Sequence, residues 1–538
     1  MSLLGKLGVR AAAVAAVFGW MLFCGGCGDT YRPVANPVLQ PGGDPQRTAH
    51  AVVVSSNGAN PGHAVVIDVS GDTVSAIVSV GRNPVQASFL GLSDYVVNQA
   101  DNNVDSFVLP TPTGTADPNN PNIISLPAPT QASPNIPPAS PSFSASAGGK
   151  VFVTEPGLVA PFCSGPANCV ADISPVSNTV SLHIPVGRNP VALVATPDGT
   201  QLYCLNKNDG TVSVILPATD QVVATVPVGS SPVWGAVNTD GTHVFIVNEG
   251  SNTVSVINTA NNTVIGNPLP VGVSPNYITY QPILNRFYVT APGDNSLTVI
   301  NNNIDQTLCA ATPSLCVQKV SLAGAPCNGQ HAISVTPLAD GTRAYVADDV
   351  TNSVCVLNTT SNTFTKRICL VQEPASPAAA CVGAATPVFT ASNSDATRVY
   401  AANQYSTAPF GITSVARTNS TTGAVTTGVV TVTTSAAFPF VAGDPVTIAG
   451  VSDSFFNGVY PITSVNAAQT QFTFVQNGLP DVLPLAQNPA TATAAVLPFV
   501  SLIQTTDDSL VRVLNSDGSR PPLTIPALGL PVFIAMTP

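Results

Sequence analysis

Residues 189–229 read NPVALVATPDGTQLYCLNKNDGTVSVILPATDQVVATVPVG, and residues 231–272 repeat this pattern almost position for position as SPVWGAVNTDGTHVFIVNEGSNTVSVINTANNTVIGNPLPVG. Each unit holds four apolar runs separated by Gly, Asn, Asp and Pro, which is the composition of a four-stranded antiparallel sheet. A period of roughly forty residues is typical of propeller blades. Because a lone sheet with two apolar faces is unstable in water, neighbouring units must bury each other's faces. The repeat therefore predicts a ring of blades.

The wording of these units, with DGT, LY, NDGTVSVI and VPVG at matching positions, resembles the YVTN-family propeller repeat. It resembles the lactonase-like propellers more loosely, and it lacks the Gly-His and Trp-Asp pairs of WD-type blades. The resemblance is specific between Val186 and Gly272 and can be followed in degraded form elsewhere. It implies an all-β chain folded as a closed β-propeller.

Strand types can be counted along the chain. The innermost strand recurs near Pro84, Pro141, Pro190, Pro232, Pro275, His331, Pro387 and Pro531. The second recurs near Val52, Tyr95, Phe152, Tyr203, Phe245, Tyr288, Tyr345 and Tyr400. The third recurs in eight segments, from AVVIDVS in the first blade to SLVRVLN in the last. We predict eight blades. Seven, the more familiar number for this family, stays open because the Pro-rich stretch 110–141 obscures the second and third blades.

The two ends of the folded region complete one blade. The region opens at AHAVVVSSN, which matches a second strand, and stops at LPVFIAMTP, which matches an innermost strand. We expect the C-terminal strand to supply the missing strand of the first blade, which would close the ring and remove free sheet edges.

An insertion interrupts the last blade at residues 416–497, leaving 49–415 and 498–538 for the propeller. It has its own alternation of strands and turns, and it weakly resembles the small β modules that decorate bacterial surface proteins. A recognition appendage and a tolerated surface insertion are both open readings, since loops carry both roles.

The first 26 residues have the features of a signal segment. Lys6 and Arg10 precede an apolar run from Ala11 to Phe23 that is short for a membrane span. Gly25 and Gly26 before Cys27 resemble the lipobox of bacterial lipoproteins, which implies lipidation at Cys27. Residues 27–48 then form a Pro- and Gly-containing tether. We expect an exported protein held in the cell envelope, at the outer membrane or cell surface, by its lipid alone.

Composition bounds the partners and the cysteine chemistry. A formal charge of -11 disfavours nucleic acid, whose binding depends on Lys and Arg.

Nine cysteines remain after Cys24 and Cys27, so at least one has no partner within the chain. Close spacing favours disulfides between Cys163 and Cys169 and between Cys309 and Cys316. Cys327, Cys369 and Cys381 lie near blade connections with their pairing open, and the apolar strand patterns around Cys204 and Cys355 favour buried thiols.

Acidic residues gather in turns that a propeller would place at one end. In propellers, turns between second and third strands share an end of the ring with the blade connections, so the acids there would give that end a negative potential. It could attract a cation, with calcium as the candidate, or a basic partner. Asp also stabilises such turns by local hydrogen bonds whether or not anything binds. The residues are Asp101, Glu155, Asp209, Glu249, Asp294, Asp348, Asp349, Asp507 and Asp508.

Catalytic motifs are missing from the sequence. The five histidines show no metal-binding spacing, and there is no Gly-x-Ser-x-Gly elbow or P-loop. The leading hypothesis is a monomeric, non-catalytic binding or scaffold protein without a cofactor, whose partner is an envelope protein or a small ligand. A lactonase-like hydrolase and a surface-layer component are the alternatives. The turns at this end contribute mainly acids, with Lys207 as the clear exception. An anionic substrate is therefore disfavoured.

Overall fold

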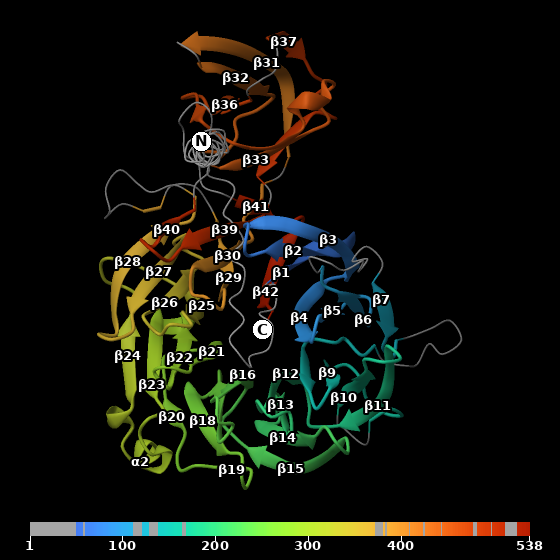
Figure 1. Cartoon of the computed structure of the whole chain (residues 1–538), viewed down its shortest axis with the longest axis vertical. Helices are drawn as coiled ribbons and strands as arrows, with labels where there is room; N and C mark the ends of the chain where they lie inside the picture. The colour runs from blue at the N-terminus through green and yellow to red at the C-terminus, as the bar shows by residue number, and fades with distance from the viewer. Residues whose placement is uncertain are drawn as a thin grey trace, which may run out of the picture.

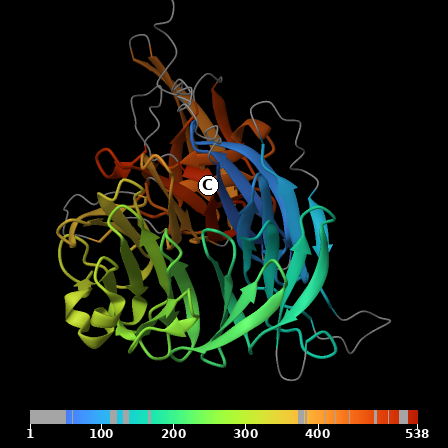
Figure 2. The same cartoon turned by 60° about the horizontal axis from the view of Figure 1, so that its bottom comes forward.

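The computed structural model of the chain shows eight antiparallel sheets arranged in a ring (Figure 1). It describes residues 50–57, 60–110, 121–128, 138–163, 168–371, 380–381, 385–407, 409–422, 425–442, 444–476, 481–496, 498–511 and 524–537. The predicted signal segment, the tether and Cys27 lie outside the described residues. Figure 2 shows the ring tilted by 60°, with the green blades brought forward.

In each of the first four blades, four strands follow one another from the channel outward. Blade 1 consists of β42 (Leu530–Met536), β1 (His50–Asn57), β2 (Asn60–Asp68) and β3 (Thr73–Arg82). Blade 2 consists of β4 (Pro84–Leu90), β5 (Ser93–Asn98), β6 (Asn103–Val108) and β7 (Asn122–Ser125). Blade 3 consists of β8 (Ser144–Ala147), β9 (Lys150–Glu155), β10 (Cys169–Ser174) and β11 (Thr179–Pro185). Blade 4 consists of β12 (Pro190–Ala195), β13 (Leu202–Asn206), β14 (Thr211–Leu216) and β15 (Gln221–Pro227).

The other four blades follow the same order, with extra short strands in two of them. Blade 5 has β16 (Pro232–Val237), β17 (His243–Asn248) and β18 (Thr253–Asn258), and β18 pairs with both β19 (Thr263–Val264) and β20 (Leu269–Pro270). Blade 6 has β21 (Tyr277–Gln281), β22 (Arg286–Ala291), β23 (Ser296–Asn301) and β24 (Val317–Ser321). Blade 7 has β25 (Ala332–Pro337), β26 (Arg343–Asp348), β27 (Ser353–Asn358) and β28 (Thr363–Cys369). Blade 8 has β29 (Pro387–Ser392), β30 (Arg398–Asn403), β39 (Phe499–Gln504) and β40 (Ser509–Leu510), with β41 (Thr524–Pro526) also on β39.

The core lies between the blades. At one position of the second strand, seven blades bury an aromatic ring that is at most 1% exposed: Tyr95, Phe152, Tyr203, Phe245, Tyr288, Tyr345 and Tyr400. These are the residues that mark the second strands in the sequence. Neighbouring blades pack on them, as where Tyr400 lies in one cluster with Val53 and Ile67 of blade 1. The predicted count of eight blades is confirmed.

The C-terminal strand completes the first blade, as predicted. β42 pairs with β1 from Ala51↔Met536 to Ser56↔Leu530. The His50 amide donates to the Thr537 hydroxyl at 2.8 Å, and the Thr537 amide donates to the His50 carbonyl at 2.9 Å. Gln404 of the neighbouring blade donates to the Pro531 carbonyl. The ring is therefore closed by hydrogen bonds between its first strand along the chain, β1, and its last, β42.

The last blade differs from the sequence prediction in one strand. SLVRVLN was expected as its third strand, but the third strand is β39, and Ser509–Leu510 form the fourth strand. Residues 512–515 lie outside the described part of the chain. The error arose because the insertion separates the second strand from the third. The segment SLVRVLN, whose first residues form the fourth strand, was therefore assigned to the third.

The insertion is a separate β module with a core of its own. Its strands are β31 (Phe410–Thr422), β32 (Val425–Thr434), β33 (Pro445–Ala449), β34 (Gly458–Pro461), β35 (Ser464–Val465), β36 (Gln471–Val475), β37 (Val482–Ala486) and β38 (Thr493–Val496). Phe438, Phe440 and Phe472 form its aromatic centre. In Figure 1 it stands out from the rim of the ring.

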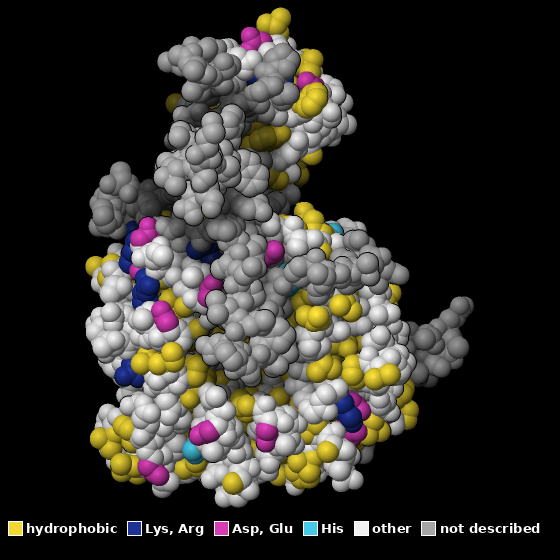
Figure 3. Space-filling view, in the orientation of Figure 1, with side chains coloured by type: hydrophobic (Ala, Val, Ile, Leu, Met, Phe, Trp, Pro, Cys, Tyr) yellow, Lys and Arg dark blue, Asp and Glu magenta, His cyan; other side chains and the backbone are white. Residues whose placement is uncertain are grey.

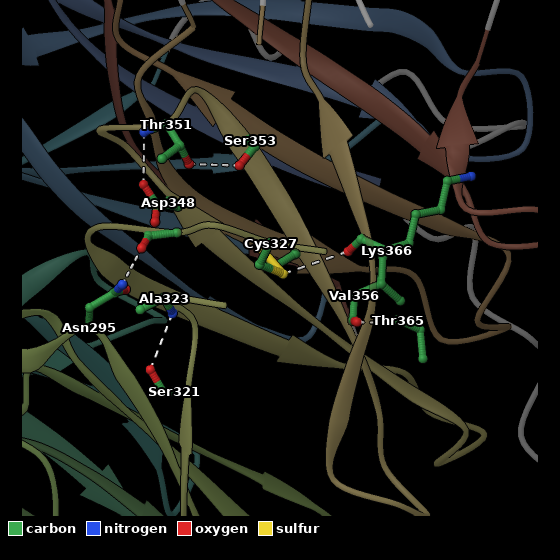
Figure 4. Close-up of a disulfide and its surroundings, with 12 residues drawn as sticks. Asn295, Ser321, Ala323, Cys327, Asp348, Thr351, Ser353, Val356, Thr365 and Lys366 are labelled. Atoms are coloured by element: carbon green, nitrogen blue, oxygen red, sulfur yellow. Dashed lines mark hydrogen bonds between the residues drawn. A yellow bond between two sulfur atoms is a disulfide. The ribbon is translucent and has the colours of Figure 1, made fainter. Parts of the chain in front are cut away.

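Within the described part of the chain, four disulfides fasten loops of blades 3, 6 and 7. The structure pairs Cys163 with Cys169 and Cys309 with Cys316, the two pairs that the spacing favours. It also pairs Cys369 with Cys381. Cys327 is bonded to Cys355 across 28 positions of sequence, and Figure 4 shows this bond beside β28. The expectation of a buried thiol at Cys355 is wrong, because the connection before blade 7 passes directly over the middle of β27. Among the described residues Cys204 is the free cysteine, and it is buried.

Candidate functional site

Seven of the nine predicted acids lie at the end of the ring formed by the turns between second and third strands and by the blade connections. We call this the connection end. Six of these seven have a basic neighbour: Asp101 with Arg82, Glu155 with His183, Asp209 with Arg188, Glu249 with Lys207, Asp294 with Lys319, and Asp349 with His331. Most of these carboxylates therefore face a partner within the chain rather than one another.

Two of the pairs are copies of one local structure. The sequence VGRNP occurs before blade 2 and before blade 4. In the first copy the Arg82 amide and Nε donate to the two carboxylate oxygens of Asp101, at 2.7 and 2.6 Å. In the second copy the Arg188 amide and Nε donate in the same way to Asp209, at 2.6 and 2.5 Å. The repeated geometry indicates that these acids fix the blade connections.

Glu155 and Asp348 occupy a structural position of the repeat. Each is the last residue of its second strand, where other blades have asparagines such as Asn206 and Asn248. Both acids are fully buried. Asp348 accepts the backbone amides of Gln330, His331 and Thr351, the last at 2.8 Å in Figure 4. These two carboxylates therefore cap backbone groups or neighbouring side chains.

The pKa shifts at this end follow from burial and pairing. Burial acts to raise the pKa of Asp209, but the hydrogen bonds and charge of Arg188 hold it below its usual range. Burial likewise opposes the Lys319 and Ser296 contacts that lower the pKa of Asp294. Burial raises the pKa of Glu155 in spite of its His183 partner. Paired acids at the surface thus remain ionised, with part of their charge neutralised.

Asp507 and Asp508 do not lie at the connection end, contrary to the prediction. They sit in the turn between β39 and β40, the third and fourth strands of blade 8, at the opposite end of the ring. Asp508 lies 2.5 Å from Arg343 of blade 7 and accepts the Tyr345 hydroxyl. The misplacement follows from the wrong strand assignment in blade 8. A calcium site stays a prediction, and within the described ranges no three His, Cys, Asp or Glu side chains gather to hold a metal.

Asp508 belongs to a set of contacts between neighbouring blades that repeats at its end of the ring, which we call the latch end. A residue with positive φ in the turn between third and fourth strands reaches back to the second strand of the preceding blade. Asp72 binds Arg398 and Tyr400, Asp220 binds Lys150, Asn262 binds Tyr203, Asn362 binds Arg286, and Asp508 binds Arg343 and Tyr345. The sequence prediction did not foresee these contacts, and it placed Asp508, the one acid of the set that it included, at the other end. RVY, RAY and RFY nevertheless recur at the starts of the second strands.

Aromatic side chains line the central channel, a feature that the sequence prediction also missed. They lie two residues after a proline close to the start of an innermost strand, in five of the eight blades: Phe143, Trp234, Tyr277, Phe389 and Phe533. Consecutive rings touch, with centroid distances of 5.2 Å from Phe143 to Trp234 and 4.8 Å from Phe389 to Phe533. Tyr277 joins the two groups at 5.1 and 5.5 Å. We call these five residues the aromatic belt. The proline spacing is the signal that could have revealed them.

A cavity of about 390 Å³ adjoins the aromatic belt. Four belt residues line it together with side chains from the innermost strands of blades 1, 2, 5, 6, 7 and 8. Thr279, Thr336 and Ser392 supply hydroxyl groups, and the lining contains no Asp, Glu, Lys, Arg or His. The charged groups of the ring and this cavity are thus separate. The ion pairs fix turns and blades, whereas the lining of the cavity is uncharged.

Comparisons with known proteins gave distant structural likenesses. No protein-family model matches the chain, and no curated protein matches it. Among solved structures, AztD from Citrobacter koseri is 14% identical and has a TM-score of 0.44, covering 66% of this chain and 89% of its own. Virginiamycin B lyase from Staphylococcus aureus is 12% identical at a TM-score of 0.41, covering 59% and 90%. Hydrazine synthase from Kuenenia stuttgartiensis is 15% identical at a TM-score of 0.41, covering 60% and 92%. At these identities the likeness concerns the β-propeller fold and carries no activity over to this chain.

Proposed function

We propose that the chain is an exported, lipid-anchored protein of the bacterial cell envelope, of the YVTN-repeat kind, which holds a protein partner without catalysis. In this proposal the ring is a rigid platform and the inserted module is the recognition element. The repeat wording and the signal-like segment ending at Cys27 support the first part. Within the described residues no helix is long and apolar enough to cross a membrane.

The observation that carries the proposal is the independence of the module from the blade that holds it. β30 and β39 remain hydrogen-bonded neighbours from Arg398↔Gln504 to Asn403↔Phe499, although the module is inserted between them. The module begins and ends close together, because β31 pairs with β38 at Phe410↔Ala494. A folded unit that leaves the pairing of its host blade intact can present a binding surface without disturbing the ring.

The module also exposes apolar side chains. Phe455 is 61% exposed, Val459 42% and Leu483 86%. Arg417 stacks over Phe456 beneath this region, with its guanidinium carbon 4.9 Å from the ring centroid. In Figure 3 the projecting module shows several hydrophobic groups on its outer surface. Exposed apolar side chains on a rigid support are a common basis of protein contacts.

The test compares three forms of the mature protein in cross-linking of intact envelopes. One is unchanged, one has residues 409–497 replaced by a short Gly-Ser link, and one carries Phe455→Ser, Val459→Ser and Leu483→Ser. We expect both altered forms to keep the melting transition of the ring and to lose the cross-linked partner. Val176→Ser, at a side chain that is 94% exposed on blade 3, is the matched control. Retention of the same partner by the form without the module would contradict the proposal.

A lactone panel distinguishes the hydrolase alternative. The cations that a lactonase-like site would use at the connection end, Arg188 and Lys207 among them, are paired with acids. We expect no turnover by the purified protein. Turnover that Arg188→Ala abolishes would favour the enzyme.

A further inference from the structure

The aromatic belt arises from one position of the repeat. In register, Trp234 pairs with Val247 and Phe389 with Ala402, and each follows a bulge at the start of its innermost strand. The equivalent residues of the other three blades are Gln86, Ala192 and Ser334. These three are buried, whereas the five belt rings are only half-buried. In blades 4 and 7 a small residue lies between two rings that meet across it, as Trp234 and Phe143 do across Ala192. The other two ring contacts join neighbouring blades.

The belt leaves ring faces and edges accessible from the cavity. Half-buried aromatics in the middle of a fold cost free energy unless something apolar covers them, and they bind other rings by stacked or edge-to-face contacts. The next position along the innermost strands that faces the cavity is small or short, with Thr279, Thr336, Ala391 and Ala535. The cavity therefore has a wide aromatic side and a side of small residues, and its volume lies in the usual range for small-molecule sites.

The polarity of the cavity restricts the ligand. Among its hydroxyls, Thr336 already donates to the Thr390 carbonyl at 2.7 Å, and the Ser392 hydroxyl lies 3.5 Å from the Pro337 carbonyl. Burial raises the pKa of Tyr277 to about 12, so this phenol stays neutral. A charged ligand would lose its hydration without gaining an opposite charge from the lining.

We propose that the central channel is a binding site for an uncharged small molecule that carries a flat ring system, held between the aromatic belt and the Thr279 side of the cavity. Ring contacts supply the affinity. The Thr279 and Ser392 hydroxyl oxygens can still accept a hydrogen bond, so they select a ligand with one or two polar groups that donate. This site lies in the ring and is independent of the module, so the channel can bind its ligand whether or not the module binds a partner.

The experiment uses the fluorescence of Trp234. The sequence contains two tryptophans, and Trp20 lies in the predicted signal segment, so Trp234 is the sole tryptophan of the mature protein. The probe is N-phenyl-naphthylamine, which is uncharged, aromatic and fluorescent in apolar sites. We expect saturable binding with quenching of Trp234 emission. The sulfonated analogue of the same ring system should bind at least about tenfold more weakly, because it brings a buried charge.

Cavity-filling variants locate the probe. Thr279→Phe should weaken binding by at least about tenfold while the melting temperature is retained, because the added ring occupies the cavity. Ser392→Phe fills the same cavity from blade 8 and should weaken binding in the same way. It replaces the first variant if Thr279→Phe does not fold. The matched control, Thr365→Phe, makes the same change on the exposed face of β28 and should leave binding unchanged. The absence of saturable quenching, or equal affinity in both folded filling variants and the control, would overturn the proposal.

Discussion

The two ends of the ring use acidic side chains in different ways. At the connection end, Arg188 and Asp209 join a turn to a blade connection, and their side chains are 57% and 24% exposed. At the latch end, Arg398 and Asp72 join blade 8 to blade 1, and theirs are 5% and 12% exposed. The same pair of residue types is therefore a surface contact in one place and a largely buried clamp in the other. Burial, rather than the number of acids, should decide what each pair contributes.

The largest effect is expected where the latch end and the closing strand meet, in blade 1. Deleting residues 530–538 removes β42, leaves β1 as a free edge and exposes the interface that Ile534 helps to bury. We expect a loss exceeding the about 5 kcal/mol that single substitutions reach, and hence no native cooperative melt. Calorimetry checks this. A truncated chain that melts like the parent would show that the ring does not depend on the strand.

The next effect is expected at the latch between the first and last blades. Asp72→Ala leaves the nearly buried Arg398 guanidinium and the Tyr400 hydroxyl without their carboxylate. We expect the free energy of unfolding to fall by about 3 kcal/mol, as for the breaking of a buried pair. Denaturant unfolding measures this change. Asp101→Ala at the connection end is the matched control, and an equal loss in the two variants would remove the distinction between the ends.

A buried acid that forms no ion pair should make the stability of the protein depend on pH. Asp94 lies at a position of the second strand where blades 3, 5 and 8 have Val151, Val244 and Val399. Burial raises its pKa from 3.8 to about 8, although the backbone amide of Tyr95 acts to lower it. The folded state thus holds an extra proton between these pH values, so stability falls as pH rises through this range.

Asp94→Val should therefore stabilise the protein at pH 8 and flatten the decline. Melting temperatures measured from about pH 5 to pH 8 test this, because the range lies between the two pKa values. Parallel pH profiles of the parent and the variant would mean that the carboxyl group is not buried in the folded protein.

The smallest effect is expected at the repeated connection pairs. Asp101→Asn keeps an acceptor for the Arg82 amide and loses a partly exposed ion pair, so we expect a change below about 1 kcal/mol that shrinks further in salt. Thermal melts at low and high salt provide the measurement. A calcium-dependent rise in melting temperature that this variant abolishes would instead favour the predicted cation site.

The fold could be predicted in detail from the sequence because the blades repeat. The buried aromatic that marks the second strand in seven of the eight blades, as at Tyr203 and Phe245, recurs at the same place in the core. The prediction was wrong where the module interrupts the repeat. β39 was not recognised as the third strand of blade 8, and Asp508 was therefore assigned to the wrong end of the ring. It was also wrong for Cys355, because a connection crossing a strand has no signature in spacing.

The candidate site was less predictable than the fold. The acids were recognised by their turns, but their partners come from other segments, as Arg188 does for Asp209, and periodicity does not show such pairs. The aromatic belt was detectable in principle, because Pro232-Val-Trp234 and Pro387-Val-Phe389 share one spacing. Recognising it required knowing that this position faces a channel, which follows only once the ring is closed.

A double-mutant cycle on each of two pairs is the most direct test of the difference between the ends. The pairs are Asp72 with Arg398 and Asp209 with Arg188, with each residue changed to alanine alone and together, and with unfolding free energies compared. We predict a coupling energy of about 2–3 kcal/mol for the first pair and below about 1 kcal/mol for the second. Equal couplings, or a larger one at the connection end, would contradict the account.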